Sequence, residues 1–361
     1  MEKLEDAFTD RLEKLNPNQR LAVDTIHGPV LVVAGPGAGK TELLALRTAN
    51  ILRQTDILPE SILLLTFTDK ASVNMRDRLV RIIGPAAHKV SIFTFHSLAT
   101  DIINSNLDYF FNGVPYHPAS DVDRVRIIES ILKSLDRDNP LSIYHPERGY
   151  VYLGEIISKI GDLKEGNLLP EQLEEFLKKN RSFYQVLGGI FDVLEEVGGK
   201  RNLESILPSY NLIINELERQ STKNNEIAKV LYTTLTEAAK KAKEEEKSTP
   251  LTLWKKKYLV KDKYNKFILK ENKEGEQEKL FALSEVYKKY QEVLQNTALF
   301  DYEDMILMAN RGLKENRELF YNLQEKYQYI MIDEFQDTNQ AQFDLVLNLL
   351  SGQSSPNVLA V

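Results

Sequence analysis

The chain has 361 residues, of which 42% are hydrophobic, so it is long enough for more than one domain and can build sizeable cores. It has no cysteine and only five scattered histidines, which excludes a disulfide framework and a thiolate metal site and argues against a zinc enzyme. Its 46 basic and 53 acidic residues give a formal net charge of −7, so a nucleic-acid site would have to come from a local groove.

The N-terminal segment MEKLEDAFTDRLEKLNPNQ lacks the basic start and apolar core of a signal peptide. No run approaches the roughly eighteen consecutive apolar residues of a membrane-spanning helix. The sequence therefore predicts a cytoplasmic protein without a membrane partner.

The first hundred residues alternate between short strands and helices. Residues 29–34, 61–67 and 90–95 (PVLVVA, SILLLTF and VSIFTF) are apolar and rich in branched side chains, as strands buried on both faces are. Between them, residues 39–54 and 69–84 repeat apolar positions at three- and four-residue spacing. This order predicts a parallel sheet with right-handed helical crossovers.

The residues from 101 to 314 are dominated by helical patterns and dense charge. Within them, residues 253–273 (LWKKKYLVKDKYNKFILKENK) interleave lysines with aromatic side chains. Those aromatic residues are Trp254, Tyr258, Tyr264 and Phe267. Two interpretations stay open, a nucleic-acid surface or an amphipathic helix whose aromatics are core and whose lysines are solvated.

A buried-strand pattern returns at residues 327–335 (YQYIMIDEF), and PNVLAV starts another strand at the end of the chain. We therefore predict an α/β fold in which one split domain, 1–100 and 315–361, is interrupted by a large, mostly α-helical insertion domain, 101–314. Because a core-strand pattern stops at Val361, we expect a piece of a longer protein. An edge strand at a natural terminus is the alternative.

The run LVVAGPGAGKTELLALR, from residue 31, has the chemistry of a phosphate-binding loop. A strand that turns through glycines into a helix directs backbone N–H groups and the positive end of the helix dipole at one point, where an anion binds. The Lys40 amine can reach the outer phosphates, and the Thr41 hydroxyl can hold Mg²⁺. Ala34 stands where the strict pattern has glycine, and it precedes the turn, so a methyl group is tolerated there. The predicted nucleotide-binding residues of the loop are Gly35, Gly37, Ala38, Gly39, Lys40 and Thr41.

An acidic pair follows the strand-like segment YIMI. Asp333 can hold the magnesium ion through water, and Glu334 can orient or deprotonate an attacking water. Two adjacent carboxylates after a strand can be purely structural, but beside a phosphate loop they favour nucleotide hydrolysis over transfer to a small acceptor.

Six segments in order resemble the UvrD/Rep-like superfamily 1 DNA helicases: LNPNQRLAV, AGPGAGKT, LLLTFTDKASVNMRDRL, IFTFHSL, LFDYEDMI and YIMIDEFQDTNQAQ. They cover only the α/β portion, because the insertion matches the family in nothing but being helical. The resemblance implies a RecA-like P-loop domain that binds ATP and Mg²⁺. It also implies that Gln19 recognises the adenine, and that Gln336 lies near the γ-phosphate and acts with Lys40 and Glu334 in catalysis.

The same resemblance implies a set of contacts to single-stranded DNA. Phe67 would stack on a base, a contact that contributes roughly 1–3 kcal/mol per base without demanding a sequence. Tyr302 matches another aromatic that faces the strand. Thr66, Thr94 and His96 would lie along the same edge and reach phosphates or sugars. Without the resemblance, Phe67 and Tyr302 would be read as core residues.

Three features depart from the family pattern. Glu42 follows Lys40-Thr41 where many relatives have an arginine that touches the nucleotide, so that contact is in doubt. The insertion is longer than in the compact members. A second RecA-like domain, which supplies arginines to the transition state, is missing, and such an arginine is worth on the order of 10³–10⁵ in rate. We therefore expect this chain alone to bind ATP weakly and not to unwind DNA.

The predicted function of the intact protein is that of an ATP-dependent DNA helicase, moving 3′ to 5′ on single-stranded DNA in nucleoid-associated repair or recombination. A 3′-tailed duplex is the expected substrate, and repair proteins or a nuclease are the candidate partners. The alternative is a nucleotide-dependent DNA- or protein-binding scaffold that does not unwind. A P-loop kinase is a weaker alternative, because it does not predict TFTDKAS or DEFQD.

Overall fold

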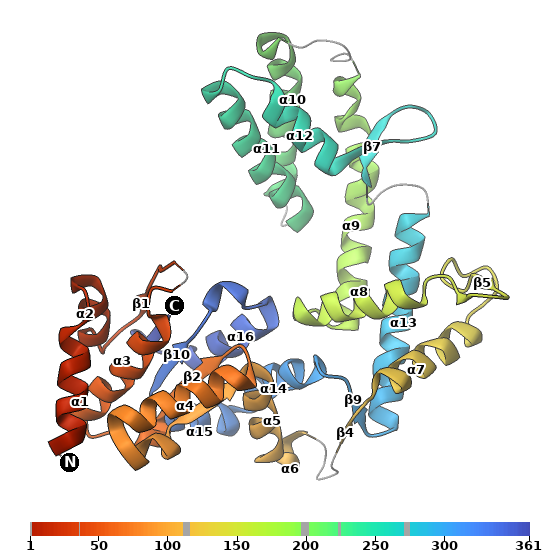
Figure 1. Ribbon diagram of the computed structural model, residues 1–361. Coiled ribbons are helices and arrows are strands. Elements are labelled where there is room, and N and C mark those ends of the chain that lie inside the picture. The colour runs from red at the N-terminus through yellow and green to blue at the C-terminus, as the bar shows by residue number, and fades with distance from the viewer. Residues whose placement is uncertain (1, 36, 111–115, 196–201, 223–224, 271–274) are drawn as a thin grey trace. The chain divides into compact units, whose positions relative to one another are not determined.

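The computed structural model describes residues 2–35, 37–110, 116–195, 202–222, 225–270 and 275–361. The chain divides into two compact units (Figure 1). The sheet unit comprises Met1–Val125, Ile157–Leu168 and Val293–Val361, and the helical unit comprises Arg126–Ile156 and Leu169–Glu292. These units group residues by proximity, and the predicted domain boundaries at residues 101 and 314 stay a prediction.

The sheet unit contains the parallel strands expected from the sequence. Its strands are β1 (Val30–Leu31), β2 (Ile62–Thr66), β3 (Ser91–Thr94), β10 (Tyr329–Ile332) and β11 (Val358–Ala360), with β4 (His117–Pro118) and β9 (Leu299–Phe300) as a separate pair. Its helices are α1 (Glu2–Glu13), α2 (Pro17–Asp24), α3 (Lys40–Gln54), α4 (Asp69–Ile83), α5 (Phe95–Asn104), α6 (Leu107–Phe110), α14 (Asp304–Glu315), α15 (Arg317–Lys326) and α16 (Gln340–Leu350).

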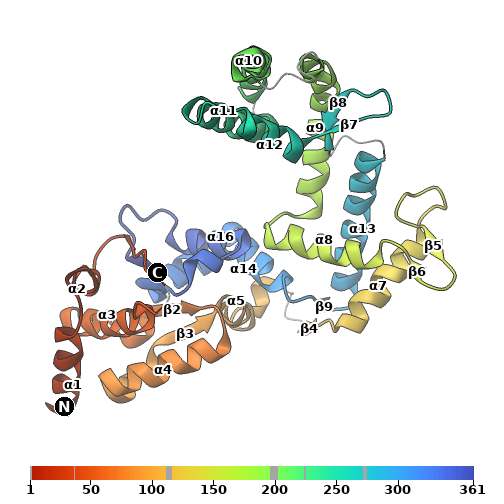
Figure 2. The same cartoon turned by 45° about the horizontal axis from the view of Figure 1, so that its top comes forward.

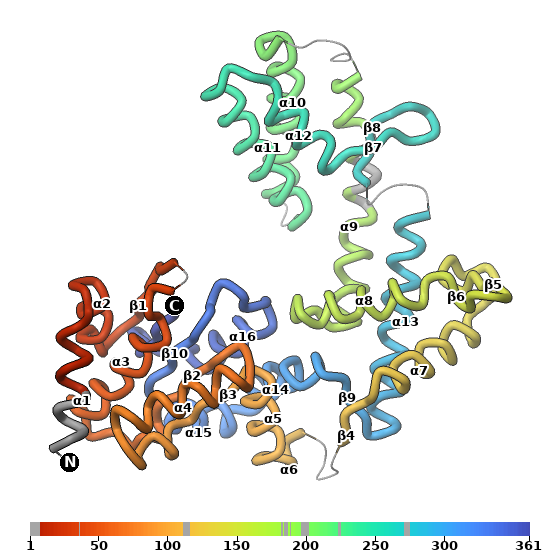
Figure 3. The backbone as a smooth tube through the Cα atoms, viewed as in Figure 1, coloured from red at the N-terminus to blue at the C-terminus, as the bar shows by residue number. Residues whose placement is uncertain are grey.

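The main sheet has five strands in the order β1-β11-β10-β2-β3, and every neighbouring pair is parallel. Strands β10 and β11, from the end of the chain, are therefore inserted between β1 and β2. Figure 3 shows β10 between β1 and β2. The prediction of an α/β fold with a parallel sheet, divided between the two ends of the chain, is confirmed.

Helices cover both faces of this sheet. The chain crosses in one direction from β1 to β3 and returns in the other from β10 to β11, so right-handed crossovers place α3 and α4 on one face and α16 on the opposite face. Figure 2 shows α3 and α4 on one side of β2 and α14 and α16 on the other. Ile62 and Leu64 join the core under α3 and α4, while Leu63 and Leu65 are also buried and alternate to the other face.

The helical unit has its own core. It contains α9 (Pro170–Ile190), α10 (Leu203–Ser221), α11 (Glu226–Glu244), α12 (Thr249–Tyr258), and the hairpins β5–β6 (Tyr144–His145, Gly149–Tyr150) and β7–β8 (Leu259–Lys261, Phe267–Leu269). Three further helices contribute residues to both units: α7 (Asp121–Ser134), α8 (Leu153–Glu165) and α13 (Glu276–Asn296). Leucines, isoleucines and the buried Trp254 fill the space between α10, α11 and α12.

The lysine-rich segment near residue 260 is only partly helical. Helix α12 ends at Tyr258, and the chain then pairs with itself as the β7–β8 hairpin. The expectation of one amphipathic helix is therefore wrong beyond Tyr258. Trp254 is nevertheless core, as that interpretation required, and its indole donates to Thr234.

No helix in the described ranges is long and apolar enough to span a bilayer.

A buried ion cluster links α8 to the loop before α14 within the sheet unit. Lys164 is fully buried and pairs with Asp301 and with Asp304, the second at 2.7 Å. The two carboxylates also accept from each other's backbone N–H, at 3.0 and 3.1 Å. Buried charges of this kind persist only when paired, because each loses its hydration on folding.

We predict that Lys164→Met destabilises the sheet unit by about 3–5 kcal/mol, because two buried carboxylates lose their main cation. Denaturant unfolding, followed in the transition of that unit, measures the change. Lys159→Met is the matched control, because Lys159 lies on the same helix in an exposed pair with Asp162 and should cost less than about 1 kcal/mol. Equal losses of unfolding free energy in the two variants would show that the buried Lys164 pairs do not stabilise the unit more than an exposed pair does.

Candidate nucleotide and DNA site

The phosphate loop leads from the end of β1 into α3. Gly37 and Gly39 both have φ of 77°, a left-handed backbone that glycine adopts without strain. Gly39 is the N-cap of the 15-residue helix α3, and among the described residues no side-chain cap hydrogen bond is found there. A Cβ built at Gly35 or Gly37 meets nothing within 4 Å, so neither position is crowded by other described atoms. This uncapped helix start fits an anion such as a phosphate.

Lys40, at the start of α3, reaches the acidic pair that follows β10. Its Nζ lies 2.7 Å from Glu334 Oε2, between residues 294 positions apart in the sequence. The hydrogen bond from Lys40 lowers the pKa of Glu334, and Gln336 donates to the same carboxylate oxygen. The structure thus brings together the three residues predicted to act in catalysis.

The backbone after β10 turns sharply. Glu334 has a left-handed backbone, with φ of 53°, which costs a non-glycine residue on the order of 1 kcal/mol. Asp333 stays buried at the end of the strand, where its N–H donates to Leu65. Burial, followed by the neighbouring charge of Glu334, raises the pKa of Asp333. A cation beside Asp333 would offset both causes.

The acidic pair does not form a metal site by itself. Across the described ranges, no three His, Asp or Glu side chains gather closely enough to hold a metal ion. Thr41 and Asp333 offer one hydroxyl and one carboxylate, and Mg²⁺ in nucleotide sites takes one or two protein groups plus phosphate oxygens and water. The donors present fit a magnesium ion that arrives with a nucleotide.

A cavity of about 500 Å³ lies between α2 and the start of the phosphate loop. Asn16 and Gln19 form a capping box at the N-terminus of α2, and the Gln19 side chain also donates to the Ala38 carbonyl of the loop at 2.9 Å. Both ends of the Gln19 amide are thus engaged in protein contacts. Arg47 of α3 donates to carbonyls at the end of α2, including Ala22 at 2.6 Å, which fixes this wall of the cavity.

Glu42 has a role that sequence reasoning missed. It accepts from Arg11 of α1 at 2.8 Å and from Arg78 of α4 at 2.6 Å, so it joins three helices beside the phosphate loop. Burial opposes its ionisation, but the two arginines outweigh that effect and lower the pKa of Glu42. The partners lie 31 and 36 positions away in the sequence, and no local signal pairs them.

The residues predicted to contact DNA separate into an exposed set and a buried set. Tyr302 is 62% exposed and Phe67 is 51% exposed, which is unusual for large side chains of their kind. The Tyr302 ring stacks on His96, with centroids 3.7 Å apart and an interplanar angle of 20°. Burial raises the pKa of Tyr302, and the negative charge of Asp69, two residues after Phe67, raises it further.

Thr66 and Thr94 are buried at the ends of β2 and β3. The Thr66 hydroxyl lies 2.6 Å from that of Ser72, and Thr94 forms a capping box with Ser97 at the start of α5. These side chains position the strand ends rather than form a surface, and contacts of Thr66 and Thr94 to DNA stay a prediction.

His96 is held neutral by its surroundings. Burial lowers its pKa to about 4 from an ordinary value of 6.5. It therefore supports the Tyr302 ring by stacking and adds no positive charge at neutral pH.

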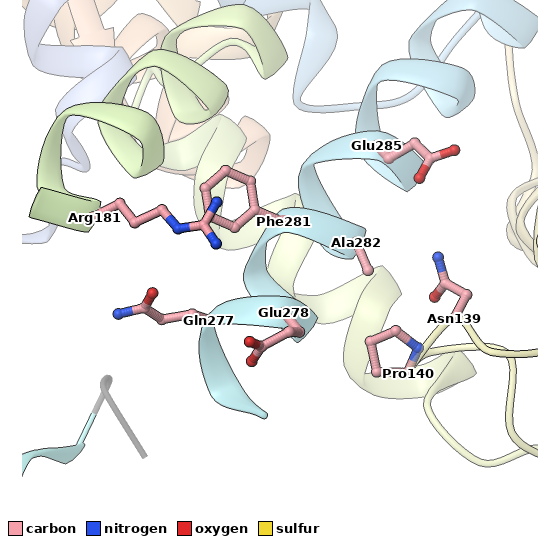
Figure 4. A pocket seen from close by; sticks show the side chains of 8 residues that line it. All are labelled: Asn139, Pro140, Arg181, Gln277, Glu278, Phe281, Ala282 and Glu285. Atoms are coloured by element: carbon pink, nitrogen blue, oxygen red, sulfur yellow. The ribbon is translucent and has the colours of Figure 1, made fainter. Parts of the chain in front are cut away.

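A second cavity, of about 350 Å³, lies within the helical unit (Figure 4). Arg181 comes from α9 and Phe281 from α13, and Glu278 and Glu285 also lie on α13. None of its lining residues was singled out by the sequence, and its charges are mixed.

The chain is similar to known proteins both as a family and as individual sequences. A model of the UvrD/REP helicase N-terminal domain matches residues 15–233 and 207–361. The ATP-dependent DNA helicase PcrA of Bacillus subtilis is 26% identical over 342 residues, which are 94% of this chain and 31% of that protein. A probable DNA helicase II homolog of Rickettsia conorii is 26% identical over 336 residues, 92% of this chain and 35% of that protein. The chain thus spans about a third of the length of these relatives.

We predict that the sheet unit loses stability as the pH falls from about 6.5 towards 4, in part through His96. In that window an unfolded chain protonates this imidazole and the folded chain does not, so protons favour unfolding. His96→Phe keeps an aromatic ring and should show a smaller fall in Tm between pH 7.5 and 4.5. His88→Gln, at an exposed histidine of the same unit, should keep the fall of the unsubstituted protein. If His96→Phe keeps it too, burial of a neutral imidazole is not the cause.

Proposed function

Because the chain belongs to the UvrD/REP helicase N-terminal domain family, we propose that it is the ATP-binding N-terminal portion of an ATP-dependent DNA helicase. The observation that carries this proposal is the 2.7 Å contact between Lys40 and Glu334. It joins a loop suited to phosphate to a strand-end carboxylate that can orient or deprotonate water. These are the two halves of a nucleotide hydrolysis site.

Different parts of the site would bind the phosphates and the base of the nucleotide. The uncapped start of α3 and the Lys40 amine would bind the phosphates, and the cavity beside α2 would hold the base. Gln19 lines that cavity and already bridges α2 to the loop carbonyl of Ala38. For the Gln19 amide to read an adenine edge, it would exchange at least one of its present protein contacts.

The acidic pair would serve two purposes. Thr41 and Asp333 would hold the magnesium ion that accompanies ATP, and bound ATP-Mg²⁺ supplies the phosphoryl group to be transferred. When Lys40 turns from Glu334 to a phosphate, the Glu334 carboxylate becomes available to orient or deprotonate water. Gln336, which donates to the same carboxylate, would hold it in place after Lys40 has left.

The exposed aromatic residues would bind single-stranded DNA. Phe67 lies at the end of β2, and Tyr302 is backed by His96, so each can offer a ring face to a base. Movement from 3′ to 5′, a 3′-tailed duplex substrate and a role in repair or recombination follow from the family resemblance and are part of the proposal.

Translocation would need a second motor domain. The family resemblance puts the nucleotide between two RecA-like domains, and an arginine from the second is worth on the order of 10³–10⁵ in rate. Lys40, Glu334 and Gln336 supply contacts from one side only. We therefore propose that unwinding belongs to the longer protein.

We predict that Lys40→Ala weakens ATP-Mg²⁺ binding by this chain roughly tenfold to a hundredfold, because a charged hydrogen bond to phosphate contributes about 1.5–3 kcal/mol. Titration with a fluorescent ATP analogue measures the affinity. Binding of a single-stranded oligonucleotide should stay within a factor of two or so, and Lys159→Ala should alter neither. Unchanged nucleotide affinity in Lys40→Ala would remove the nucleotide site from this loop.

We also predict that this chain alone has at most about a thousandth of the DNA-stimulated ATPase rate of the longer protein. Phosphate release with and without single-stranded DNA, measured side by side for the two proteins, tests this. Robust DNA-stimulated turnover by this chain would show that its own residues complete the site.

A further inference from the structure

The strongest concentration of positive charge in the sequence lies in the helical unit. Residues 255–270 hold seven lysines and one aspartate, in a protein whose formal net charge is −7. We call this segment, the end of α12 and the β7–β8 hairpin, the lysine hairpin. Six of its lysines are exposed, and Lys255 is half-buried. A cluster of one sign against an opposite overall charge is typical of a binding surface for a polyanion.

The hairpin turn has a fixed shape. The Asp262 carboxylate accepts from the backbone N–H groups of Tyr264 and Lys266, both at 2.8 Å. Asn265 takes the left-handed conformation, with φ of 65°, that such a short hairpin loop requires. The only acidic side chain of the segment is therefore engaged in forming the turn. Tyr264 is left 73% exposed at the tip.

Two ammonium groups converge on one aromatic ring at the base of the hairpin. Lys255 Nζ lies 4.2 Å and Lys261 Nζ 5.1 Å from the centre of the Phe267 ring. Burial and the charge of Lys261 lower the pKa of Lys255. The ring attracts each cation, but the two cations repel each other, and an anion between them would remove that repulsion.

The hairpin is anchored in the core of the helical unit. Trp254, Leu259 and Leu269 are buried in the core of the helical unit. The inward residues of the segment therefore form core while its lysines and Tyr264 form surface. The amphipathic interpretation therefore holds for the inward residues, and a nucleic-acid surface stays a prediction for the exposed ones.

We propose that the lysine hairpin is a separate nucleic-acid contact, which takes the phosphate backbone beside Lys255 and Lys261 and offers Tyr264 to an unstacked base. Phosphates along a strand match several lysines at once, and an exposed ring at a rigid tip suits base stacking. An acidic protein would use the lysines and leave the ring without a partner. The backbone can come from a single strand or from a duplex, and the test separates them.

The experiment measures DNA affinity of the whole chain against salt concentration, by anisotropy of a labelled single strand and of a labelled blunt duplex. Lys255→Gln/Lys261→Gln should reduce the slope of log affinity against log salt by about 1.8 for the duplex or about 1.4 for the single strand, which is two phosphate contacts. The DNA probe whose slope changes shows whether the lysine hairpin binds a single strand or a duplex. Tyr264→Ala should weaken single-strand binding roughly tenfold and leave the duplex unchanged.

Lys240→Gln/Lys241→Gln is the matched control, because it removes two exposed lysines from α11 of the same unit. The proposal fails if the hairpin pair behaves as this control pair does. It also fails if polyglutamate displaces both DNA probes from the unsubstituted protein and from Tyr264→Ala equally well, which would identify a surface for acidic proteins. If Lys255→Gln/Lys261→Gln lowers the Tm of the helical unit, the salt slopes are measured instead with Lys256→Gln/Lys263→Gln, which replaces two exposed lysines.

This proposal and the nucleotide proposal fail separately. Lysine-hairpin variants should bind ATP-Mg²⁺ as the unsubstituted protein does, and Tyr302→Ala should lower single-strand affinity without changing the salt slope for the duplex. A chain that binds no nucleotide could still show the lysine-hairpin effect.

Discussion

The parallel pairing of β10 with β2 on one side and β11 on the other is the constraint on which the site depends. Parallel strands end at the same edge of a sheet, so the carboxyl end of β10 reaches the edge where the phosphate loop leaves β1. Lys40 and Glu334 can then meet across 294 positions of sequence. The same edge holds Phe67 after β2 and His96 after β3, so the residues proposed to bind nucleotide and the exposed aromatics lie on one sheet edge.

Buried and partly buried polar contacts hold the elements that carry this edge. Arg47 ties α2 to α3 through backbone carbonyls, Glu42 ties α3 to α1 and α4 through two arginines, and Lys164 ties α8 to the loop that presents Tyr302. Such contacts add little net stability, because each charge loses hydration on burial. They do fix geometry, because a displaced charge would be left unpaired. The apolar core of the sheet unit supplies the stability, and these ion pairs select one arrangement of it.

Much of the fold could be predicted from the sequence because its signals are local. The apolar runs at 61–67 and 90–95 match β2 and β3 to within a residue or two, and the glycines at 37 and 39 match backbone that needs glycine. The carboxylates after β10 follow from the same kind of pattern. The partners of Glu42 and Lys164 could not be foreseen, since Arg11 lies 31 positions from Glu42 and Asp301 lies 137 positions from Lys164, and their pairing follows from tertiary packing. The β7–β8 hairpin was missed because lysines obscured its turn residues, Asp262 and Asn265.

If the proposed function holds, the contact between Lys40 and Glu334 would also set the order of events at the site. While the amine holds the carboxylate, it lowers the pKa of Glu334 and occupies the group that water would need. A phosphate at the start of α3 would compete for the same amine, and the positive end of the helix dipole would also attract it. Its arrival would release Glu334 only once the nucleotide is in place, and the left-handed turn at Glu334 keeps the carboxylate beside the loop when that happens. Under the proposed function, this internal ion pair would couple occupancy of the loop by a phosphate to the availability of the Glu334 carboxylate.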